Sequence, residues 1–352
     1  FPTETVLALQ DERLLSVLVP EELGGAGATV SEVGEAVASI GRHCASSAMV
    51  LAMHQLQVAC LVRHGHTPTL RAYLRRVSSD QLLLASATTE AGVGGDLRTS
   101  VCTVEREGEG FRLEKSAPVI SYGEQADAIL VTARRAPDSP PNDQVLVLCS
   151  PPGLLLEPTS GWDAMGFRGT CSLGFQLRAR GSLDAILPDP FSDISAQTML
   201  PVSHVLWSFV WLGLAGAAVE RARRFVQGEA RKRPGVTPPS ATRLAELTAV
   251  FQQMSDLVHG AARRYEEAAG APGLGATIGY AISMNALKVS ASTLVVDVVG
   301  RAMAICGMAG YREDSPLSLG RLLRDAYGAA LMVNNDRILA NNAQMLLVHK
   351  ES

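Results

Sequence analysis

The chain has 352 residues and a formal net charge of -4, and 47% of its residues are hydrophobic, 19% charged and 5% aromatic. This length is enough for one large domain, or for roughly two to three small ones, with a substantial core. The near-neutral charge favours neither a nucleic-acid partner nor an anionic membrane surface. Six scattered cysteines, without CxxC or Cys/His clusters, predict no disulfide framework and no metal site, and they favour a reducing cytoplasm.

Residues 1–82 are predicted to form a helical domain. Apolar residues recur at helical spacing from Val30 to His64, after a short glycine-rich segment. No uninterrupted apolar run approaches the about 18 residues that a spanning helix needs. The chain also does not open on a basic region followed by an apolar core, so we expect neither a membrane span nor a targeting segment.

Residues 83–194 are predicted to form a β domain. Short apolar runs separated by turn residues replace the helical period, namely LLLASATTE, FRLEKSAPVIS, AILVTAR, QVLVLCS and LGFQLRAR. From residue 195 to 352 the helical period returns in three long segments. Pro238-Pro239 is expected to separate the first two, because proline lacks a backbone N–H and clashes with the preceding turn. The predicted layout is helices, a β domain and a helical bundle.

Six motifs follow one another in a characteristic order. They are VPEELGGAG at 19–27, TTEAGVGGD at 88–96, VISYGEQADAILVTAR at 119–134, AMGFRG at 164–169, AICGMAGY at 304–311 and LLRD at 322–325. With this set the chain resembles the acyl-CoA dehydrogenase family of flavoproteins over essentially its full length. The resemblance implies an α+β fold with an N-terminal helical domain, a middle β-barrel domain and a C-terminal four-helix bundle. It also leads us to expect that a short N-terminal stretch of the family is absent before Phe1.

The glycine-rich segment TTEAGVGGD is the first candidate cofactor site. Taken alone it is typical of a hairpin turn, yet Gly92, Gly94 and Gly95 would let backbone amides approach a pyrophosphate closely. The resemblance implies that the cofactor is FAD. It implies contacts to the flavin ring from Thr88 and Thr89, to the pyrophosphate from Gly94 and Gly95, and to the flavin face from Val119, Ile120 and Ser121. Val119 replaces the family's Trp, which opens space beside the ring, and Gly95 replaces a Ser.

In this family the adenine half of FAD crosses a subunit boundary, so the resemblance implies a homodimer or homotetramer. The family's Arg-x-x-Phe-Gly corresponds here to RKRPG, beginning at Arg231, which would reach the cofactor of a neighbouring protomer. The same basic cluster also suits a solvated helix end. Ala304 and Met308 replace a Gln and a Gly of the late glycine motif, which weakens the implied adenine contacts.

The family's dehydrogenation requires a carboxylate that takes the α-proton of an acyl thioester, carried by coenzyme A or an acyl carrier protein. By resemblance, this Glu would lie eight residues after Asp325, at Val333. A minority of members place it on the first long C-terminal helix, which corresponds to Ser203. Both positions lack a carboxylate.

Three interpretations of the missing base stay open. His204, beside the alternate position, could be a non-standard base in an FAD-dependent dehydrogenation, or simply a buried histidine bonded to a backbone carbonyl. Alternatively the chain is a flavin-dependent monooxygenase, as are family relatives that lack the Glu, with Val119 leaving room for oxygen chemistry. Finally it could be the base-less subunit of a heteromeric dehydrogenase.

The segment NND at 334–336 is also open to two interpretations. Asn favours caps and turns, so the segment could end one helix and N-cap the next. By resemblance, Asn335 occupies the slot of the family's FAD-binding Thr, Arg337 would contact the pyrophosphate or adenine, and Asn334 would face the substrate cavity. The amide of Val333 could still donate to a thioester carbonyl, because backbone donors survive side-chain replacement.

Overall fold

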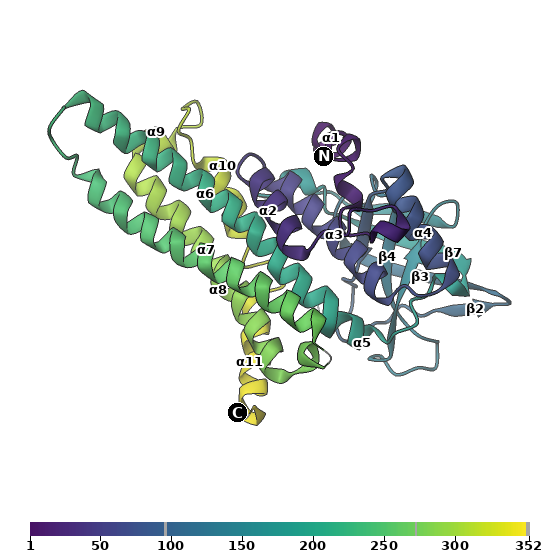
Figure 1. Ribbon diagram of the computed structural model, residues 1–352. Coiled ribbons are helices and arrows are strands. Elements are labelled where there is room, and N and C mark those ends of the chain that lie inside the picture. The colour runs from purple at the N-terminus through teal and green to yellow at the C-terminus, as the bar shows by residue number, and fades with distance from the viewer. Residues whose placement is uncertain (95–96, 272, 350–352) are drawn as a thin grey trace. The chain divides into compact units, whose positions relative to one another are not determined.

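The computed structural model describes residues 1–94, 97–271 and 273–349 (Figure 1). The chain divides into two compact units. The sheet unit comprises Phe1–Val33, Val50–Asp163 and Arg168–Ser203. The helical unit comprises Gly34–Met49, Ala164–Phe167 and the chain from His204 onward.

The sheet unit contains helices α1 (Thr3–Asp11) and α4 (Pro68–Asp80) and most of helix α3 (Ala45–His64). The start of α4 follows from its sequence: the Thr67 hydroxyl accepts a hydrogen bond from the Leu70 amide, and Pro68 occupies the first helical turn. The buried His54 on α3 connects distant segments. Its Nε2 bonds the Leu15 carbonyl at 2.6 Å, and its Nδ1 accepts from the Leu84 amide at 2.9 Å.

The β domain is built from two sheets. Strands β1 (Leu84–Ala87), β4 (Ala128–Arg134) and β5 (Gln144–Cys149) form one, in the order β1-β4-β5. Strands β2 (Glu105–Glu107), β3 (Gly110–Ile120), β7 (Leu173–Ser182) and β6 (Leu154–Ser160) form the other, in the order β2-β3-β7-β6. Only the β1–β4 pair among these strands is parallel. The expected barrel therefore consists of two sheets, and β5 is buried along its whole length.

The helical unit contains three long helices, and Figure 1 shows them as neighbouring rods: α6 (Leu200–Lys232), α7 (Ser240–Gly270) and α8 (Ile278–Cys306). The predicted break at Pro238-Pro239 is confirmed, since it lies between α6 and α7. Shorter helices complete the unit: α2 (Val30–Gly41), α9 (Met308–Tyr311), α10 (Gly320–Gly328) and α11 (Asn335–Val348). Helix α8 contacts α7, α10 and α11. A short α5 (Phe191–Ile194) leads through one π-helical turn into α6.

Helix α2 approaches α6 closely because both carry glycine at their contacts. A Cβ on Gly34 would lie 2.4 Å from the Phe209 ring, and one on Gly213 would lie 2.2 Å from the Ala38 carbonyl oxygen. No real side chain tolerates such distances. The two glycines therefore fix the separation of the helices.

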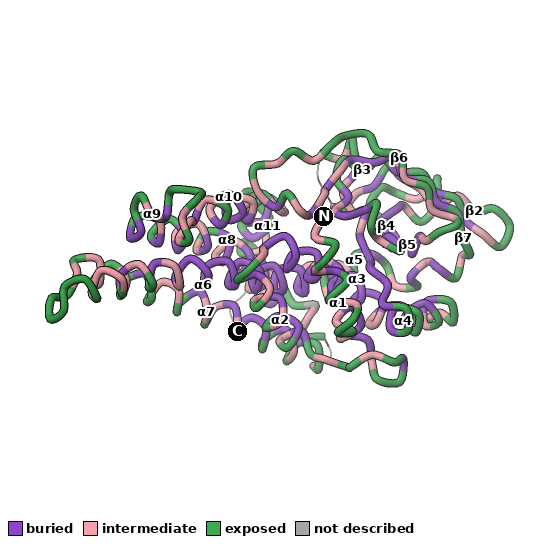
Figure 2. Tube along the Cα trace, turned by 90° about the horizontal axis from the view of Figure 1, so that it is seen from above, coloured by how far each residue is buried: buried purple, intermediate pink, exposed green. Residues whose placement is uncertain are grey.

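Three helices are long and apolar enough to cross a membrane by length and composition alone: Ala45–His64, Phe191–Lys232 and Ile278–Cys306. The sequence predicted no membrane-spanning helix because it has no uninterrupted apolar run of that length. The three helices reach a high mean hydropathy although small and polar residues are scattered along them. Their apolar windows are 83%, 100% and 44% buried within the fold, and Figure 2 shows the mixture of buried and exposed residues. The chain's own core thus covers the first two, and α8 retains a partly exposed apolar face.

Candidate flavin and acyl sites

The predicted ring contacts come together at the ends of two strands. Thr89, just after β1, donates from Oγ1 to the Val119 carbonyl on β3 at 2.9 Å. The pairing of β3 with β7 shifts between Ala117 and Ile120, which is a β-bulge. Val119 lies in this bulge, and its side chain is 38% exposed. An apolar side chain is therefore exposed where the resemblance places the flavin.

Ser121 belongs to a chain of hydroxyl groups. Its Oγ lies 2.8 Å from the Ser172 hydroxyl, which lies 2.8 Å from the hydroxyl of Thr170. The Thr170 carbonyl in turn accepts from the Tyr122 amide. Ser172 and Thr170 were not predicted from the sequence, since only the fold brings this second serine beside Ser121. The chain fixes the orientation of the hydroxyl that the resemblance assigns to the flavin.

The acidic residue of the TTE segment has a structural role. Glu90 is buried and accepts hydrogen bonds from the Ser100 hydroxyl at 2.6 Å and the Cys102 amide at 2.6 Å. It also lies 3.4 Å from the fully buried ammonium of Lys115. Burial lowers the pKa of Lys115, and the charge of Glu90 opposes that shift. This ion pair anchors the start of the glycine-rich loop.

The glycine-rich loop leaves space for a ligand. Gly92 and Gly94 have φ values of 90° and 59°, which only glycine adopts without strain. A Cβ on either residue would meet no atom within 4 Å. Gly95 lies outside the described residues. An open loop, an exposed bulge and oriented hydroxyls in this unit fit the phosphates and ring of a flavin dinucleotide.

In the helical unit, Val333, where the resemblance places the catalytic Glu, lies in the turn between α10 and α11. Val333 has a φ of 49°, which is unusual for a β-branched residue. Its carbonyl accepts a hydrogen bond from the Lys288 ammonium at 2.6 Å, and the Asn335 side-chain oxygen accepts a second one at 2.7 Å. The Ser292 hydroxyl accepts from the Asn335 amide nitrogen at 3.0 Å. We call Lys288, Val333, Asn335 and Ser292 the lysine clamp.

Lys288 is fully buried on α8, and the sequence did not predict it as a site residue. Burial lowers its pKa to about 8. Its ammonium lies 6.0 Å from the centre of the Trp211 ring. The available signal was its position: it shares the buried face of α8 with Met284, Leu287 and Ala291, where a lysine requires specific partners.

The remaining predicted residues of this unit lie near its surface. The Asn334 side chain accepts from the Asp336 amide at 2.8 Å, which confirms the N-cap interpretation of NND. Arg337 is exposed on the first turn of α11. Arg231 is exposed in the last turn of α6. The structure thus separates Asn335, held in the clamp, from these exposed residues, whose cofactor contacts stay predictions.

His204 is buried on α6, with 1% of its surface exposed. Its Nδ1 lies 3.1 Å from the Met284 carbonyl, which can only accept, so Nδ1 carries the proton. Nε2 therefore holds a lone pair, and it has no hydrogen-bond partner among the described residues. Burial, aided by the Lys288 charge and opposed by the hydrogen bond to Met284, lowers the pKa of His204 to about 4. The histidine is neutral at physiological pH, with an unused acceptor.

The depressed pKa of His204 predicts a pH-dependent stability. The imidazole takes a proton in the unfolded chain below its ordinary pKa of 6.5, but in the folded chain only near a pKa of about 4. The contribution of His204 to the free energy of unfolding is therefore present above pH 6.5 and is lost as the pH falls toward 4. When the pH is lowered from about 7 to about 5, we expect the unfolding free energy of His204→Asn to fall by about 2 kcal/mol less than that of the unmodified chain. Urea denaturation at the two pH values measures this. Equal losses in both proteins would contradict a neutral His204.

The LLRD and AMGFRG motifs are in contact through a hydrogen bond. The buried Asp325 of LLRD accepts a hydrogen bond from the Phe167 amide of AMGFRG at 2.7 Å. Burial raises the pKa of Asp325, and this hydrogen bond opposes the shift. A Cβ on Gly166 would lie 2.3 Å from the Arg324 carbonyl oxygen, so glycine is required there. These motifs stabilise the helical unit.

Comparison with known proteins identifies the fold. Residues 1–81 match the acyl-CoA dehydrogenase N-terminal domain, and residues 194–341 match the acyl-CoA dehydrogenase C-terminal domain. The chain belongs to the acyl-CoA dehydrogenase family. The human mitochondrial short-chain specific acyl-CoA dehydrogenase is 28% identical over 233 residues, which make up 64% of this chain and 56% of that protein.

Solved structures share the acyl-CoA dehydrogenase fold. Butyryl-CoA dehydrogenase from Megasphaera elsdenii has a TM-score of 0.83 at 21% identity, covering 99% of this chain and 90% of that one. FMN-bound TdsC from Paenibacillus sp. A11-2 has a TM-score of 0.85 at 20% identity, covering 100% of this chain and 92% of that one. TdsC is a dibenzothiophene monooxygenase. The predicted α+β fold is confirmed.

Family membership establishes the general chemistry. The acyl-CoA dehydrogenases among these relatives are flavoenzymes that oxidise C–C single bonds, and FAD is their cofactor. The expected class, a flavoprotein oxidoreductase, is therefore confirmed for this chain. No group of three or more His, Cys, Asp or Glu side chains suited to a metal occurs within the described ranges.

Proposed function

We propose that this chain oxidises a thioester-bound acyl group, carried by coenzyme A or an acyl carrier protein, by α,β-dehydrogenation. The observation that carries this proposal is the backbone of Val333. Its carbonyl is held by Lys288, and its amide N–H has no acceptor in the part of the chain that the structure describes. A positioned, unused N–H is suited to a thioester carbonyl, whose oxygen gains negative charge when the α-proton leaves.

We propose His204 as the non-standard base. Its tautomer leaves the Nε2 lone pair without a donor, and the neutral imidazole is already in the form that accepts a proton. Burial and the Lys288 charge disfavour its protonated form, so proton transfer requires that negative charge develops nearby in the same step. The other two base positions cannot perform this transfer: Val333 has no acid-base group, and the Ser203 hydroxyl donates to the Leu200 carbonyl at 2.8 Å.

FAD, when bound, supplies the hydride acceptor. In the sheet unit, Thr88, Thr89, Gly94 and Ser121 are the residues proposed to hold it, and the bulge at Val119 and Ile120 is proposed to face its ring. The Thr89–Val119 hydrogen bond and the Ser121–Ser172 contact orient these groups in advance. Such preorganisation limits the reorganisation that binding would require.

We propose that the protein is a homo-oligomer. Large apolar side chains are exposed in the C-terminal helices, including Met308, Tyr311, Leu346 and Leu347 at 68%, 70%, 57% and 87%. The apolar window of α8 is only 44% buried within this chain. Exposed apolar side chains of this size on α9 and α11 suit contacts with another subunit. A homodimer or homotetramer in the cytoplasm would cover it.

Anaerobic mixing with acyl thioesters tests the proposed function. We expect the absorbance of the oxidised flavin to bleach on addition of a saturated acyl thioester, because electrons pass from substrate to cofactor. The control is the matching α,β-unsaturated thioester, which has no hydride to give and should leave the absorbance unchanged. Persistent flavin colour with every saturated thioester tested would contradict dehydrogenation. Co-purification with a longer homologue would then support the base-less subunit of a heteromeric dehydrogenase.

A flavin-dependent monooxygenase is the second candidate. Specific observations favour it: neither family base position carries a carboxylate, and Val119, in place of the family's Trp, is 38% exposed. A hydroxylation of this kind requires no α-proton acceptor, so His204 would then be structural. Oxygen consumption that depends on added reduced flavin, without bleaching by thioesters under anaerobic conditions, would replace the first proposal with this one.

A further inference from the structure

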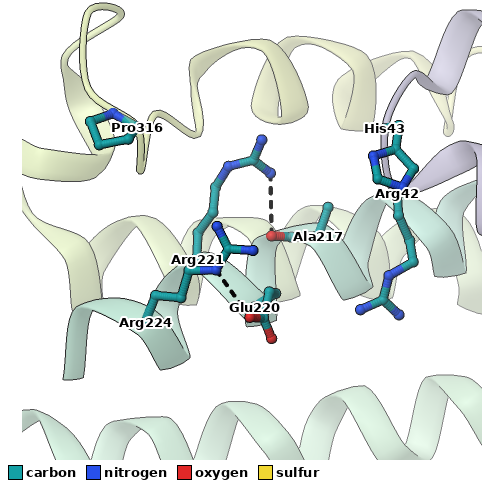
Figure 3. A pocket seen from close by; sticks show the side chains of 7 residues that line it. All are labelled: Arg42, His43, Ala217, Glu220, Arg221, Arg224 and Pro316. Carbon is teal, nitrogen blue, oxygen red and sulfur yellow. Dashed lines mark hydrogen bonds and ion pairs between the residues drawn. The ribbon is translucent and has the colours of Figure 1, made fainter. Parts of the chain in front are cut away.

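A basic pocket of about 400 Å³ lies in the helical unit (Figure 3). Its lining consists of Arg42, His43, Ala217, Glu220, Arg221, Arg224 and Pro316. Arg221 and Arg224 project from α6, and Arg42 and His43 come from the segment that follows α2. This volume is in the range of small-molecule sites, about 300 to 1,000 Å³. None of the residues predicted to contact FAD or the acyl group lines it.

The positive charges of this pocket are only partly compensated. Glu220 is the acidic residue of the lining, and it accepts from Arg224 at 3.1 Å and from Arg223 at 2.8 Å. Its charge is thus shared between two guanidinium groups. In the described ranges, neither Arg42 nor Arg221 forms an ion pair with a carboxylate.

Arg221 is held in place among like charges. It is half-buried, and its Nη1 donates to the Ala217 carbonyl at 3.2 Å within its own helix. Burial lowers its pKa, and the nearby charges of Arg321 and Arg224 lower it further. The Arg321 guanidinium donates to the His43 carbonyl at 2.7 Å, and this hydrogen bond holds Arg321 beside a residue that lines the pocket. The fold therefore maintains a concentration of positive charge that an anion would relieve.

Arg42, which follows α2, also packs closely against α6. A Cβ on Gly216 would lie 3.2 Å from Nη1 of Arg42, so the absence of a side chain there makes room for this guanidinium. Arg42 and Arg221 thus approach the pocket from two segments far apart in the sequence. Guanidinium groups present planar pairs of N–H donors, which suit the several oxygens of a phosphate group.

We propose that this pocket binds a phosphorylated small molecule, with Arg42 and Arg221 as the phosphate ligands. A diphosphate fits the arrangement better than a single carboxylate, because the arginines come from two sides and the volume exceeds that of one small ion. The pocket shares no lining residue with the proposed acyl and flavin sites. A phosphorylated metabolite would bind there without taking part in the redox reaction.

The test uses the full chain saturated with FAD, titrated calorimetrically at low ionic strength with pyrophosphate, ADP and inorganic phosphate. We expect pyrophosphate and ADP to bind, with affinity falling about tenfold or more in Arg42→Gln and in Arg221→Gln. Arg223→Gln is the matched control, because Arg223 lies on the same turn of α6 and pairs with Glu220 but does not line the pocket. We expect its affinity to stay within about threefold of the unmodified chain.

Three results would overturn the proposal. One is the absence of binding by all three anions, and another is an equal loss of affinity in Arg223→Gln, which would indicate a nonspecific charge effect. The third is a loss in Arg231→Gln that is absent in Arg42→Gln, because it would assign the anion to the predicted cofactor phosphates. Arg42 is exposed beyond the end of α2, so its variant is expected to fold even if Arg221→Gln does not. Binding of ADP but not inorganic phosphate would support the proposal and identify a nucleotide as the ligand class.

Discussion

Replacement of His204 by Asn is expected to lower the turnover of an acyl thioester by about two to four orders of magnitude, the usual contribution of a general base. Asn keeps a donor for the Met284 carbonyl, to which Nδ1 of His204 now bonds, but it has no basic nitrogen. Substrate affinity depends on other groups and should change little. The measurement is kcat and KM with a saturated acyl thioester, together with the flavin content of the variant.

The neighbouring Ser203 gives a matched control for His204. Its hydroxyl bonds only within α6, so Ser203→Ala should leave kcat within about threefold of the unmodified chain. The pH profile gives a second readout. With the pKa of His204 lowered to about 4, kcat/KM should stay level through neutral pH and fall only in stronger acid. Unchanged kcat in flavin-loaded His204→Asn would show that His204 is structural.

Much of the fold could be predicted because local chemistry determines it. The change between helical and alternating periodicity marked the β domain, and Pro238-Pro239 marked the break between α6 and α7. Strands β2 and β6 were missed. The first has only three residues, and the second is mostly exposed and contains Pro158, so neither shows an alternating apolar pattern.

The site was harder to predict because its supports are distant in the sequence. Lys288 is separated by 45 residues from the Val333 carbonyl that it holds, and Asp325 by 158 residues from the Phe167 amide. No periodicity or spacing indicates such pairs. Ser121 was expected as a flavin contact, but its partner Ser172 lies 51 residues further along the chain, just before β7.

Two motif carboxylates have structural roles. Glu90 anchors the glycine-rich loop, and Asp325 ties LLRD to AMGFRG, so both are required for the fold itself. Val333, where the resemblance places the family's Glu, is held through its backbone instead. The backbone of the turn around Val333 is fixed by Lys288, and its side chain supports no other contact of the clamp.

The lysine clamp is expected to be essential for thioester binding. In Lys288→Met, the Val333 carbonyl and the Asn335 oxygen lose their donor. The left-handed conformation of Val333, which costs about 1 kcal/mol or more, then loses the hydrogen bond that holds its carbonyl. Hydrogen bonds to a charged group contribute about 1.5 to 3 kcal/mol, so we expect affinity for a non-reactive acyl thioester analogue to fall by about tenfold to a hundredfold. Equilibrium titration of the flavin spectrum measures this.

Val333→Gly separates the role of the backbone from that of the side chain. Glycine adopts a φ of 49° without strain and keeps both the carbonyl held by Lys288 and the free amide N–H. Its affinity for the analogue should therefore stay within about threefold of the unmodified chain. Full affinity in Lys288→Met would show that the clamp does not position the amide. A large loss in Val333→Gly would instead assign thioester binding to the valine side chain, because the backbone geometry is the part that this substitution preserves.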